Sequence, residues 1–394
     1  MVASCAKKRD ASDGSQEIAG INLSIMVLAE PKDSSVNIVF DLVCSESFKT
    51  KMDSKNIGRL AATGLLFFGT ISSLTSKIQL SLVSAGYNGV IHNFSKPGMQ
   101  VLFMFLGMSF ALLFSKVIKS LSYKKDGGFS FKEYLHPIFS SICGSTALFI
   151  MITGLNRINV SIYMMLRGGQ TLFSTLFSIQ MLNKTIKRHQ WIGVGMTIFS
   201  LCIVGFAGVQ IESAASFSWK ERLIGVIYII IAQVIQGWQM VYDEYMLSRL
   251  KLPIMFVVGM EGAWGLAISF FYIAPLAYIL PGKDPSALGG SLENIQDSFL
   301  MLGNSSSLLL ICAFNVFAVC FYDISGMTVT GTMSSMHRTI FESLRPLTTW
   351  ISMLLLSFFG SPYGEKWVSW SWLELGGFIC LILSSMIFNE VITL

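Results

Sequence analysis

The sequence predicts an all-α integral membrane protein with ten membrane-spanning helices in two inverted repeats of five. Three observations support this prediction. Of the 394 residues, 53% are hydrophobic and only 13% are charged, whereas about a quarter are charged in a soluble domain. Apolar segments of about 20 residues, the length that crosses a bilayer, recur along the chain. A Leu-Arg motif in one such segment returns one half-chain later.

The charge and the cysteines exclude several partners. The net charge of +5 is not concentrated in one basic block, so we expect no nucleic-acid partner. The seven cysteines lack metal-type spacing and lie mostly in apolar runs, where cysteine behaves as a small hydrophobic residue. We therefore expect neither a metal nor a cofactor. The expected partners are a small-molecule solute and the lipid bilayer, and a homodimer stays open.

Residues 1–56 differ from the rest of the chain because they are mixed and polar. Their two apolar runs, 18–29 and 36–44, are too short to span a membrane. They lack the pattern of a secretory signal peptide. We therefore predict a largely disordered, cytosolic tail, and the first spanning helix serves as the membrane signal.

Ten apolar segments of spanning length follow the tail. Short connections dominate, and the longest, 281–305, is rich in turn residues and includes a short amphipathic piece. The first half is predicted at 57–210 and the second at 221–394. The segments are 57–84, 97–121, 135–155, 159–182, 188–210, 221–247, 254–280, 306–329, 334–360 and 370–393.

The orientation follows from the basic residues in the connections. One side of the membrane receives fourteen Lys and Arg residues and the other receives six. Because cytosolic loops carry the excess of positive charge, both termini are predicted to be cytosolic. The N-glycosylation sequons at Asn93, Asn159 and Asn304 then face the lumen or the outside, whereas those at Asn22 and Asn183 face the cytosol.

The internal repeat joins the fourth and ninth segments. The fourth contains MLRGGQTLFSTLFSIQML, and the ninth contains SLRPLTTWISMLLLSFFG. In both, an arginine precedes small residues or proline, an apolar stretch, a turn and a tryptophan, so that Arg167 matches Arg345. Five helices per half is an odd number, so the halves are inverted relative to each other. Inverted repeats with a binding site near the bilayer midplane are a transporter design.

At least seven ionisable side chains lie within the predicted spans. A charge at the bilayer centre costs about 3 kcal/mol, so these side chains face a bundle interior, a water-filled cavity or one another. Cations exceed anions by one, which favours an anionic solute. The cations are Lys77, Arg167, Arg338 and Arg345, and the anions are Glu261, Asp323 and Glu342.

The ninth segment places three of these charges on one face. Arg338, Glu342 and Arg345 are spaced i, i+4 and i+7, which aligns them along a helix. We expect this face to line a cavity and Arg167 and Arg345 to orient the solute. Pro346 is expected to perturb the helix. The alternative is that the three charges form a self-neutralising clip that locks the helix to its neighbours.

Other polar residues complete the predicted site. Gln233 and Gln239 belong to a polar stripe on the sixth segment and are candidates for solute binding. Their alternative role is to join helices. Glu261, flanked by three glycines, and Asp323 are candidates for proton coupling. Lys77 is a candidate for solute binding, although its side chain could instead extend to the interface.

Several of these motifs resemble a known family. The stretches SSLTSK at 72–77, MLRGGQTLFSTLFSIQMLNKTIKRHQWIGV, AQVIQGWQMVYDEY at 232–245 and DISGMTVTGTMSSMHRTIFESLR at 323–345 are similar to the drug/metabolite transporter superfamily. They most resemble the F-type branch of solute carrier family 35, relatives of the chloroquine-resistance transporter. The resemblance covers residue 57 to the C-terminus. It implies ten helices, a central cavity, alternating access and an endomembrane location, lysosome or vacuole first and Golgi second.

Departures from the family pattern are also visible. The third segment, FSSICGSTALF, has no acidic residue where relatives often carry one, so Glu261 or Asp323 would have to replace it.

From these observations we expect a secondary transporter of a small polar solute. We expect no enzyme, because the four histidines are scattered. The alternatives are a non-transporting receptor or scaffold and, as a specific transporter type, a Golgi nucleotide-sugar antiporter.

Overall fold

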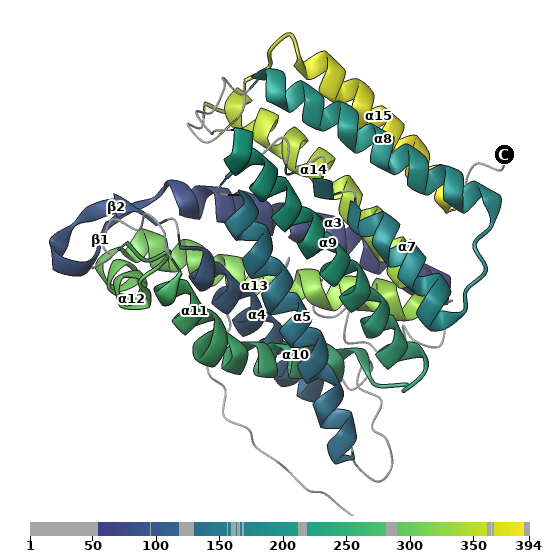
Figure 1. The fold of residues 1–394 in the computed structure, drawn as a ribbon, viewed down its shortest axis with the longest axis horizontal. Coiled ribbons are helices and arrows are strands. Elements are labelled where there is room, and N and C mark those ends of the chain that lie inside the picture. The colour runs from purple at the N-terminus through teal and green to yellow at the C-terminus, as the bar shows by residue number, and fades with distance from the viewer. Residues whose placement is uncertain are drawn as a thin grey trace, which may run out of the picture. The chain divides into compact units, whose positions relative to one another are not determined.

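The computed structural model places the apolar segments as a bundle of helices (Figure 1). All the described residues belong to one compact unit, Cys44–Leu394. The predicted tail lies outside the described residues, apart from its last three. The structure describes residues 54–94, 96–117, 130–155, 157–158, 163, 166–167, 169–211, 219–280, 290–360, 364 and 366–389.

Eight helices in the described part of the chain are long and apolar enough to cross a membrane. The all-α membrane class is therefore confirmed, whereas the ten-helix inverted repeat stays a prediction. The seventh predicted segment is one helical run in which a π-helical turn, η2 (Ser269–Ile273), joins α10 (Ile254–Ile268) to α11 (Ala274–Ile279). The other seven are α3 (Ser54–Ser81), α4 (Pro97–Val117), α5 (Phe131–Leu155), α8 (Arg188–Ile211), α9 (Trp219–Ser248), α13 (Ser306–Thr332) and α15 (Ser371–Phe388).

Two further helices occupy the positions of the fourth and ninth predicted segments. α7 (Gly169–Leu182) is the described part of the fourth, and α14 (Ser335–Phe358) is the ninth. The first half of α14 is polar because it carries the charged face. The helix continues through Pro346 to Phe358, so the expected break does not occur there.

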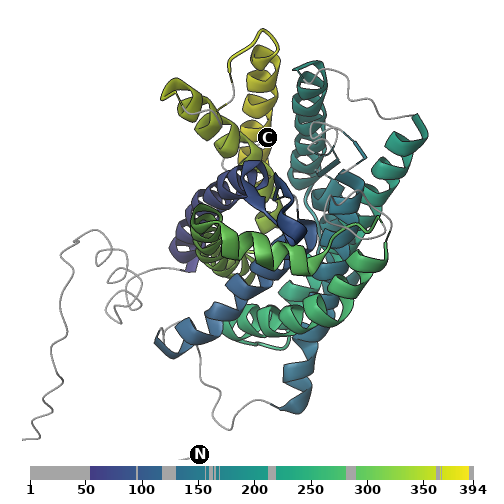
Figure 2. The same cartoon turned by 90° about the vertical axis from the view of Figure 1, so that its left-hand side faces the viewer.

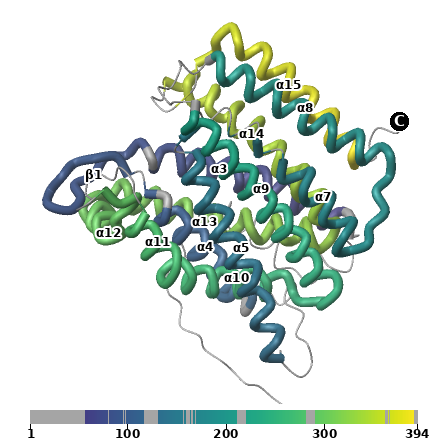
Figure 3. The backbone as a smooth tube through the Cα atoms, in the orientation of Figure 1, coloured from purple at the N-terminus to yellow at the C-terminus, as the bar shows by residue number. Residues whose placement is uncertain are grey.

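The helices pack in pairs that repeat between the two halves. α3 packs on α13 as α5 packs on α9, and α3 packs on α14 as α7 packs on α9. α4 packs on α10, and α8 lies beside α15 (Figures 2 and 3). Exchanging α3, α4, α5, α7 and α8 for α9, α10, α13, α14 and α15 therefore returns these same pairs.

Glycines permit the close approach of α10 to α4. A Cβ atom at Gly259, Gly262 or Gly265 would collide with Leu112, Ser109 or Phe105 of α4, respectively. This close approach shows that the three glycines serve helix contact. It also fixes Glu261, which lies between them, inside the bundle.

A small module outside the predicted spans caps one end of the bundle (Figure 1). β1 (Val83–Ala85) and β2 (Ile91–Asn93) form an antiparallel hairpin around η1 (Tyr87–Gly89). The expected end of the first span at 84 is wrong, because α3 stops at Ser81 and the hairpin begins. α12 (Ile295–Asn304) packs on this hairpin and is the amphipathic piece expected in the long connection.

Two predicted glycosylation sequons lie in this module. Asn93 is the last residue of β2, and its side chain is exposed. Asn304 ends α12, is exposed, and donates a hydrogen bond from Nδ2 to the Ala85 carbonyl oxygen at 2.8 Å. Asn159 lies outside the described residues.

Candidate functional site

The charged face of α14 lies inside the bundle. Arg338 and Glu342 are each 5% exposed, and Arg338 Nε donates a hydrogen bond to Glu342 Oε1 at 2.9 Å. The i, i+4 spacing read from the sequence therefore produces a buried ion pair within one helix. Ser334 starts the helix, because its Oγ accepts a hydrogen bond from the His337 N–H.

Arg338 faces carboxylates from three helices. Besides Glu342, its Nη1 lies 4.0 Å from Asp243 Oδ2 on α9, and its Nη2 lies 3.9 Å from Asp323 Oδ1 on α13. Gly326 of α13 makes room for the guanidinium group, since a Cβ atom there would lie 2.9 Å from Arg338 Nε. One arginine thus ties α14 to α9 and α13.

Asp243 and Glu261 form a carboxyl pair behind Arg338. Both are 2% exposed, and each acts electrostatically on the other. Ser140 of α5 donates a hydrogen bond to Asp243 Oδ1 at 2.6 Å. Two carboxylates buried side by side repel each other, which favours a proton on one of them. The pair is therefore a candidate site for a proton.

Two other arginines approach Glu342 without forming an ion pair with it. The Arg345 guanidinium lies over the Tyr322 ring, 5.4 Å from its centroid, and Arg167 is hydrogen bonded to Tyr163. Both cations act electrostatically on Glu342. Within the described ranges, no ion pair involves Arg167 or Arg345. Their charges remain available to a solute.

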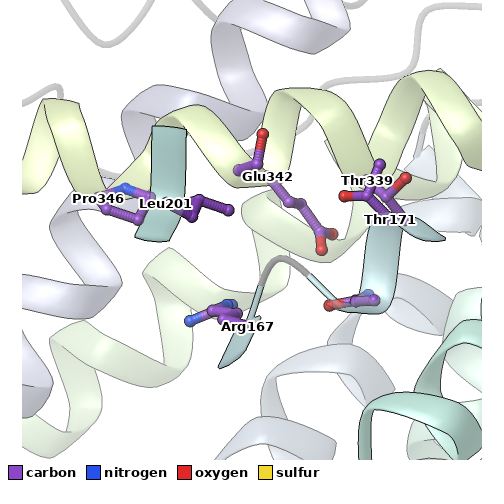
Figure 4. A pocket seen from close by; sticks show the side chains of 8 residues that line it. Arg167, Thr171, Leu201, Thr339, Glu342 and Pro346 are labelled. Atoms are coloured by element: carbon purple, nitrogen blue, oxygen red, sulfur yellow. The ribbon is translucent and has the colours of Figure 1, made fainter. Parts of the chain in front are cut away.

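A small cavity separates α14 from the segment that carries Arg167 (Figure 4). Figure 4 shows Glu342 and Thr339 reaching from α14 toward Arg167 and Thr171. The cavity measures about 10 Å³, which is room for about one water molecule. A larger solute can enter only if the helices move apart. The lining residues are Arg167, Gln170, Thr171, Leu201, Thr339, Glu342, Ser343 and Pro346.

Several buried polar atoms around this cavity and the charge cluster lack a hydrogen-bond partner among the described residues. Such atoms are rare in native proteins, and each costs about 1–3 kcal/mol. Their concentration between α7, α9, α10, α13 and α14 indicates a place that other polar groups can fill. The atoms are Gln170 Nε2, Gln233 Oε1, Glu261 Oε1, Asp323 Oδ2 and Arg338 Nη1.

One end of the site is held shut by Glu244. Its Oε2 accepts hydrogen bonds from Ser335 N at 3.0 Å and from Ser335 Oγ at 2.7 Å, and its Oε1 pairs with Lys184. Ser178 and Ser335 also meet, with their Oγ atoms 3.3 Å apart. The end of α9, the start of α14 and the end of α7 are thereby joined, at the end predicted to be cytosolic.

The structure brings most of the predicted residues together, with two exceptions. Gln233 packs near Gly169 at the start of α7, but the amide of Gln239 lies against Gly144 of α5, away from the cavity. Lys77 is exposed. It lies eight residues beyond Gly69, where α3 meets Arg345, which is about 12 Å along the helix.

The charge count also differs from the sequence-based one. Asp243 joins the cluster and Lys77 leaves it, so four carboxyl groups face three guanidinium groups. If all were ionised, the excess would be one negative charge. A single proton on the Asp243–Glu261 pair makes the cluster neutral.

Sequence reasoning missed three residues of the site. Asp243 appears in the polar stripe of α9, but nothing in its neighbourhood identifies Arg338 as its partner. Tyr322 carries no distinctive signal. Gln170 could have been found, because it lies three residues after Arg167 in the predicted fourth segment, a spacing that favours one face of a helix.

A second ionisable cluster lies in the hairpin module. Asp297 pairs with Lys96 at 2.6 Å and with His92 at 3.0 Å. Burial alone would raise the pKa of Asp297, but the hydrogen bonds from Lys96 and from the Tyr87 N–H lower it. Glu293 is fully buried, and burial raises its pKa to about 7 although it accepts hydrogen bonds from the N–H groups of Gly98 and Met99.

Comparison with known proteins identifies relatives along most of the chain. Solute carrier family 35 member F6 of Homo sapiens is 27% identical over 330 residues, which is 82% of this chain and 86% of the relative. The Mus musculus protein of the same name is 28% identical over 333 residues, with the same coverage. An uncharacterized protein of Schizosaccharomyces pombe is 24% identical over 258 residues, covering 65% of this chain and 73% of its own length. No family model matches the chain.

A solved crystal structure supports the fold. It superposes with a TM-score of 0.55 at 14% identity, covering 85% of this chain and 96% of the other; at this identity the likeness concerns the fold alone. The apolar helices and the relatives agree with the motifs read from the sequence. The chain is therefore a multi-pass membrane protein related to the F-type branch of solute carrier family 35, within the drug/metabolite transporters.

Proposed function

We propose that the protein is a secondary active transporter that moves a small polar solute with an anionic group across an endomembrane and couples this movement to protons. The relatives, which are named solute carriers, and the eight apolar helices support a membrane transporter rather than an enzyme. The equivalent packing of the two halves supports an inverted repeat with alternating access. We keep the predicted halves, 57–210 and 221–394, and the cytosolic termini as part of this proposal.

The observation that carries the proposal is the division of charge within the bundle. Arg167 and Arg345 approach Glu342 but form no ion pair within the described residues, whereas Arg338 is surrounded by carboxylates. These two guanidinium groups, which have tyrosines rather than carboxylates as partners, suit an anionic group of the solute. The Asp243–Glu261 pair suits a proton, and Arg338 connects it to Asp323 and Glu342.

Proton and solute are coupled through α14 in this proposal. α14 is held by Asp243 through Arg338 and by the neighbouring Glu244 through Ser335. A change of protonation at Asp243 therefore acts on the helix whose start closes one end of the site. Release of Ser335 from Glu244 would open that end, which we assign to the cytosol.

The proposal has two alternatives, a receptor or scaffold and a more specific type of transporter. A non-transporting receptor or scaffold would use the Arg338–Glu342 pair as a clip, but this role leaves Arg167 and Arg345 unexplained. A nucleotide-sugar antiporter of the Golgi fits the anionic group, but among the described residues no aromatic side chain lines the cavity to stack on a base. Lysosome or vacuole stays our first location.

The test is the thermal stability of the purified protein with a panel of nucleotide-sugars, nucleotides, amino acids, short peptides and cationic amphiphiles at two pH values. A ligand at a hundred times its Kd stabilises by about 2.7 kcal/mol. We expect the stabilisation to be lost in Arg345→Gln and retained in Lys77→Gln, an exposed control on α3. Equal stabilisation of wild type and Arg345→Gln would contradict the proposed role of Arg345.

A further inference from the structure

We infer that the cavity between α7 and α14 takes a zwitterionic solute of the α-amino acid class, with its carboxylate on the α7 side and its ammonium group at Glu342. This inference rests on the proposed function and names its solute class. Two features of the lining carry it: charges of both signs, and a buried donor without a partner.

The lining offers a positive and a negative group across one small space. Arg167 contributes a guanidinium group, and Glu342 reaches toward it from α14 (Figure 4). Glu342 Oε1 accepts the hydrogen bond from Arg338 Nε, which leaves Oε2 as an acceptor for a second donor. An ammonium group has three donors and no acceptor, so it matches this carboxylate.

Gln170 provides the second observation. Its side chain is 4% exposed and lines the cavity, and its Nε2 has no hydrogen-bond partner within the described part of the chain. It comes three residues after Arg167 in the chain, and both donors line the cavity. A carboxylate can accept from both at once, which satisfies the buried amide.

The hydroxyl groups beside these residues supply further acceptors. Ser343 Oγ donates to the Ile340 carbonyl oxygen at 2.7 Å, and Thr339 Oγ1 donates to the Met336 carbonyl oxygen at 3.0 Å. Because these hydrogens are used within α14, Ser343 Oγ keeps its lone pairs for an ammonium group, whereas Thr339 Oγ1 also lies 3.2 Å from Ser174 Oγ.

The net charge favours the same class. With one proton on the Asp243–Glu261 pair, the buried cluster is neutral, and a solute with no net charge keeps it neutral. A purely anionic or cationic solute would leave one uncompensated charge inside the membrane, which is unfavourable. The zwitterion is the polar solute that satisfies both charged groups without this penalty.

The experiment compares three pools of compounds by thermal stability of the full-length wild-type protein. One pool holds α-amino acids, the second holds the matched α-hydroxy acids in which a hydroxyl replaces the amine, and the third holds the matched amines without the carboxylate. We expect half-maximal stabilisation by amino acids at a concentration at least tenfold lower than by either other pool. Hydroxy acids as effective as amino acids, or no effect of the amino acid pool, would overturn the inference.

Two variants test which residue binds the ammonium group of the solute and which binds its carboxylate. In Glu342→Gln we expect the preference for amino acids over hydroxy acids to disappear. In Gln170→Leu we expect both carboxylate-bearing pools to weaken together, while their ratio is retained. A retained preference in Glu342→Gln would contradict the placement of the ammonium group; if Glu342→Gln does not fold, the wild-type comparison still decides.

Failure of the zwitterion inference gives a different experimental result from failure of the proposed function. Stabilisation by nucleotides or nucleotide-sugars, lost in Arg345→Gln, without an effect of amino acids would overturn the zwitterion and leave an anionic-solute transporter standing. A protein that no compound of the wider panel stabilises would count against both.

Discussion

At the scale of single residues, the buried charge cluster depends on one arginine shared among carboxylates. Arg338 contacts Glu342 directly and approaches Asp243 and Asp323 at 4.0 and 3.9 Å. Breaking a buried charge network by removing one member is far more costly than its formation is favourable. Displacing Arg338 from these carboxylates would break the network, so the space around Arg338 is as important as its charge.

Gly326→Ala tests that space. The new methyl group would lie 2.9 Å from Arg338 Nε, so the guanidinium group must shift away from its partners. We expect a loss of about 1–3 kcal/mol in stability, the usual range for overpacking, and weaker solute stabilisation. Gly376→Ala is the matched control, because a Cβ atom on that glycine of α15 meets nothing within 4 Å; a loss equal to that of the control would remove the steric explanation.

Residues also mark the limit of prediction from sequence. Arg167, Arg338, Glu342 and Arg345 could be found because a charge inside an apolar segment must be buried in the protein. Lys77 met the same criterion but is exposed, since a helix hides only one face. Asp243 escaped because its partner lies 95 positions later in the chain, and helix packing alone brings the two together.

At the scale of elements, the spanning helices were predictable and the small module between them was not. Length and hydropathy fix a spanning helix within a few residues. The hairpin of 83–93 had one usable signal, the Asn88-Gly89 turn, whose residues have φ of 56° and 74°, as such a turn requires. The adjoining apolar run outweighed this signal, so the first span was extended into the hairpin.

The hairpin module is predicted to be more firmly held at acidic pH. Burial raises the pKa of Glu293 to about 7, above its ordinary value of 4.5. Between these values the docked module binds a proton that the opened one releases, so stability rises as pH falls. Lys96, Ser298 and the N–H groups of Gly98 and Met99 face this carboxyl group.

Hydrogen exchange of the hairpin amides at pH 7 and pH 5.5, corrected for intrinsic rates, measures this effect. We expect up to about tenfold greater protection for each pH unit lowered, and no such dependence in Glu293→Gln. Asp297→Asn should instead reduce protection at both values, because burial raises the pKa of Asp297 less than the bonds from Lys96 and Tyr87 lower it. Protection that falls with acidity in the wild type would contradict the role of Glu293.

At the scale of the whole molecule, orientation is the first question. The loop charges predict that both termini are cytosolic, and the hairpin module is then expected to face the lumen. We expect Asn93→Gln or Asn304→Gln to remove a glycan in cells that N-glycosylate membrane proteins, and Asn22→Gln or Asn183→Gln to remove none. Electrophoretic mobility before and after endoglycosidase treatment reports this, and a glycan on Asn22 or Asn183 would reverse the assigned orientation.

The inverted repeat is predicted from a short match around Arg167 and Arg345, and the packing of the helices is consistent with it. Partners of α3 correspond to partners of α9, and α4–α10 and α8–α15 pair across the halves. A sequence shows such symmetry only where the two repeats keep the same residues, because apolar helix surfaces tolerate many substitutions. The arginines remain recognisable since few residues can replace a buried guanidinium group.

The measurement that tests the central claim most directly is uptake of the stabilising solute into proteoliposomes with an imposed pH gradient. We predict saturable accumulation driven by the gradient in the wild type. In Asp243→Asn, which removes one carboxyl group of the proton-sharing pair, accumulation should be lost while exchange of internal for external solute continues. Binding without accumulation above empty liposomes would contradict the transporter, and accumulation in Asp243→Asn equal to that of the wild type would contradict its proton site.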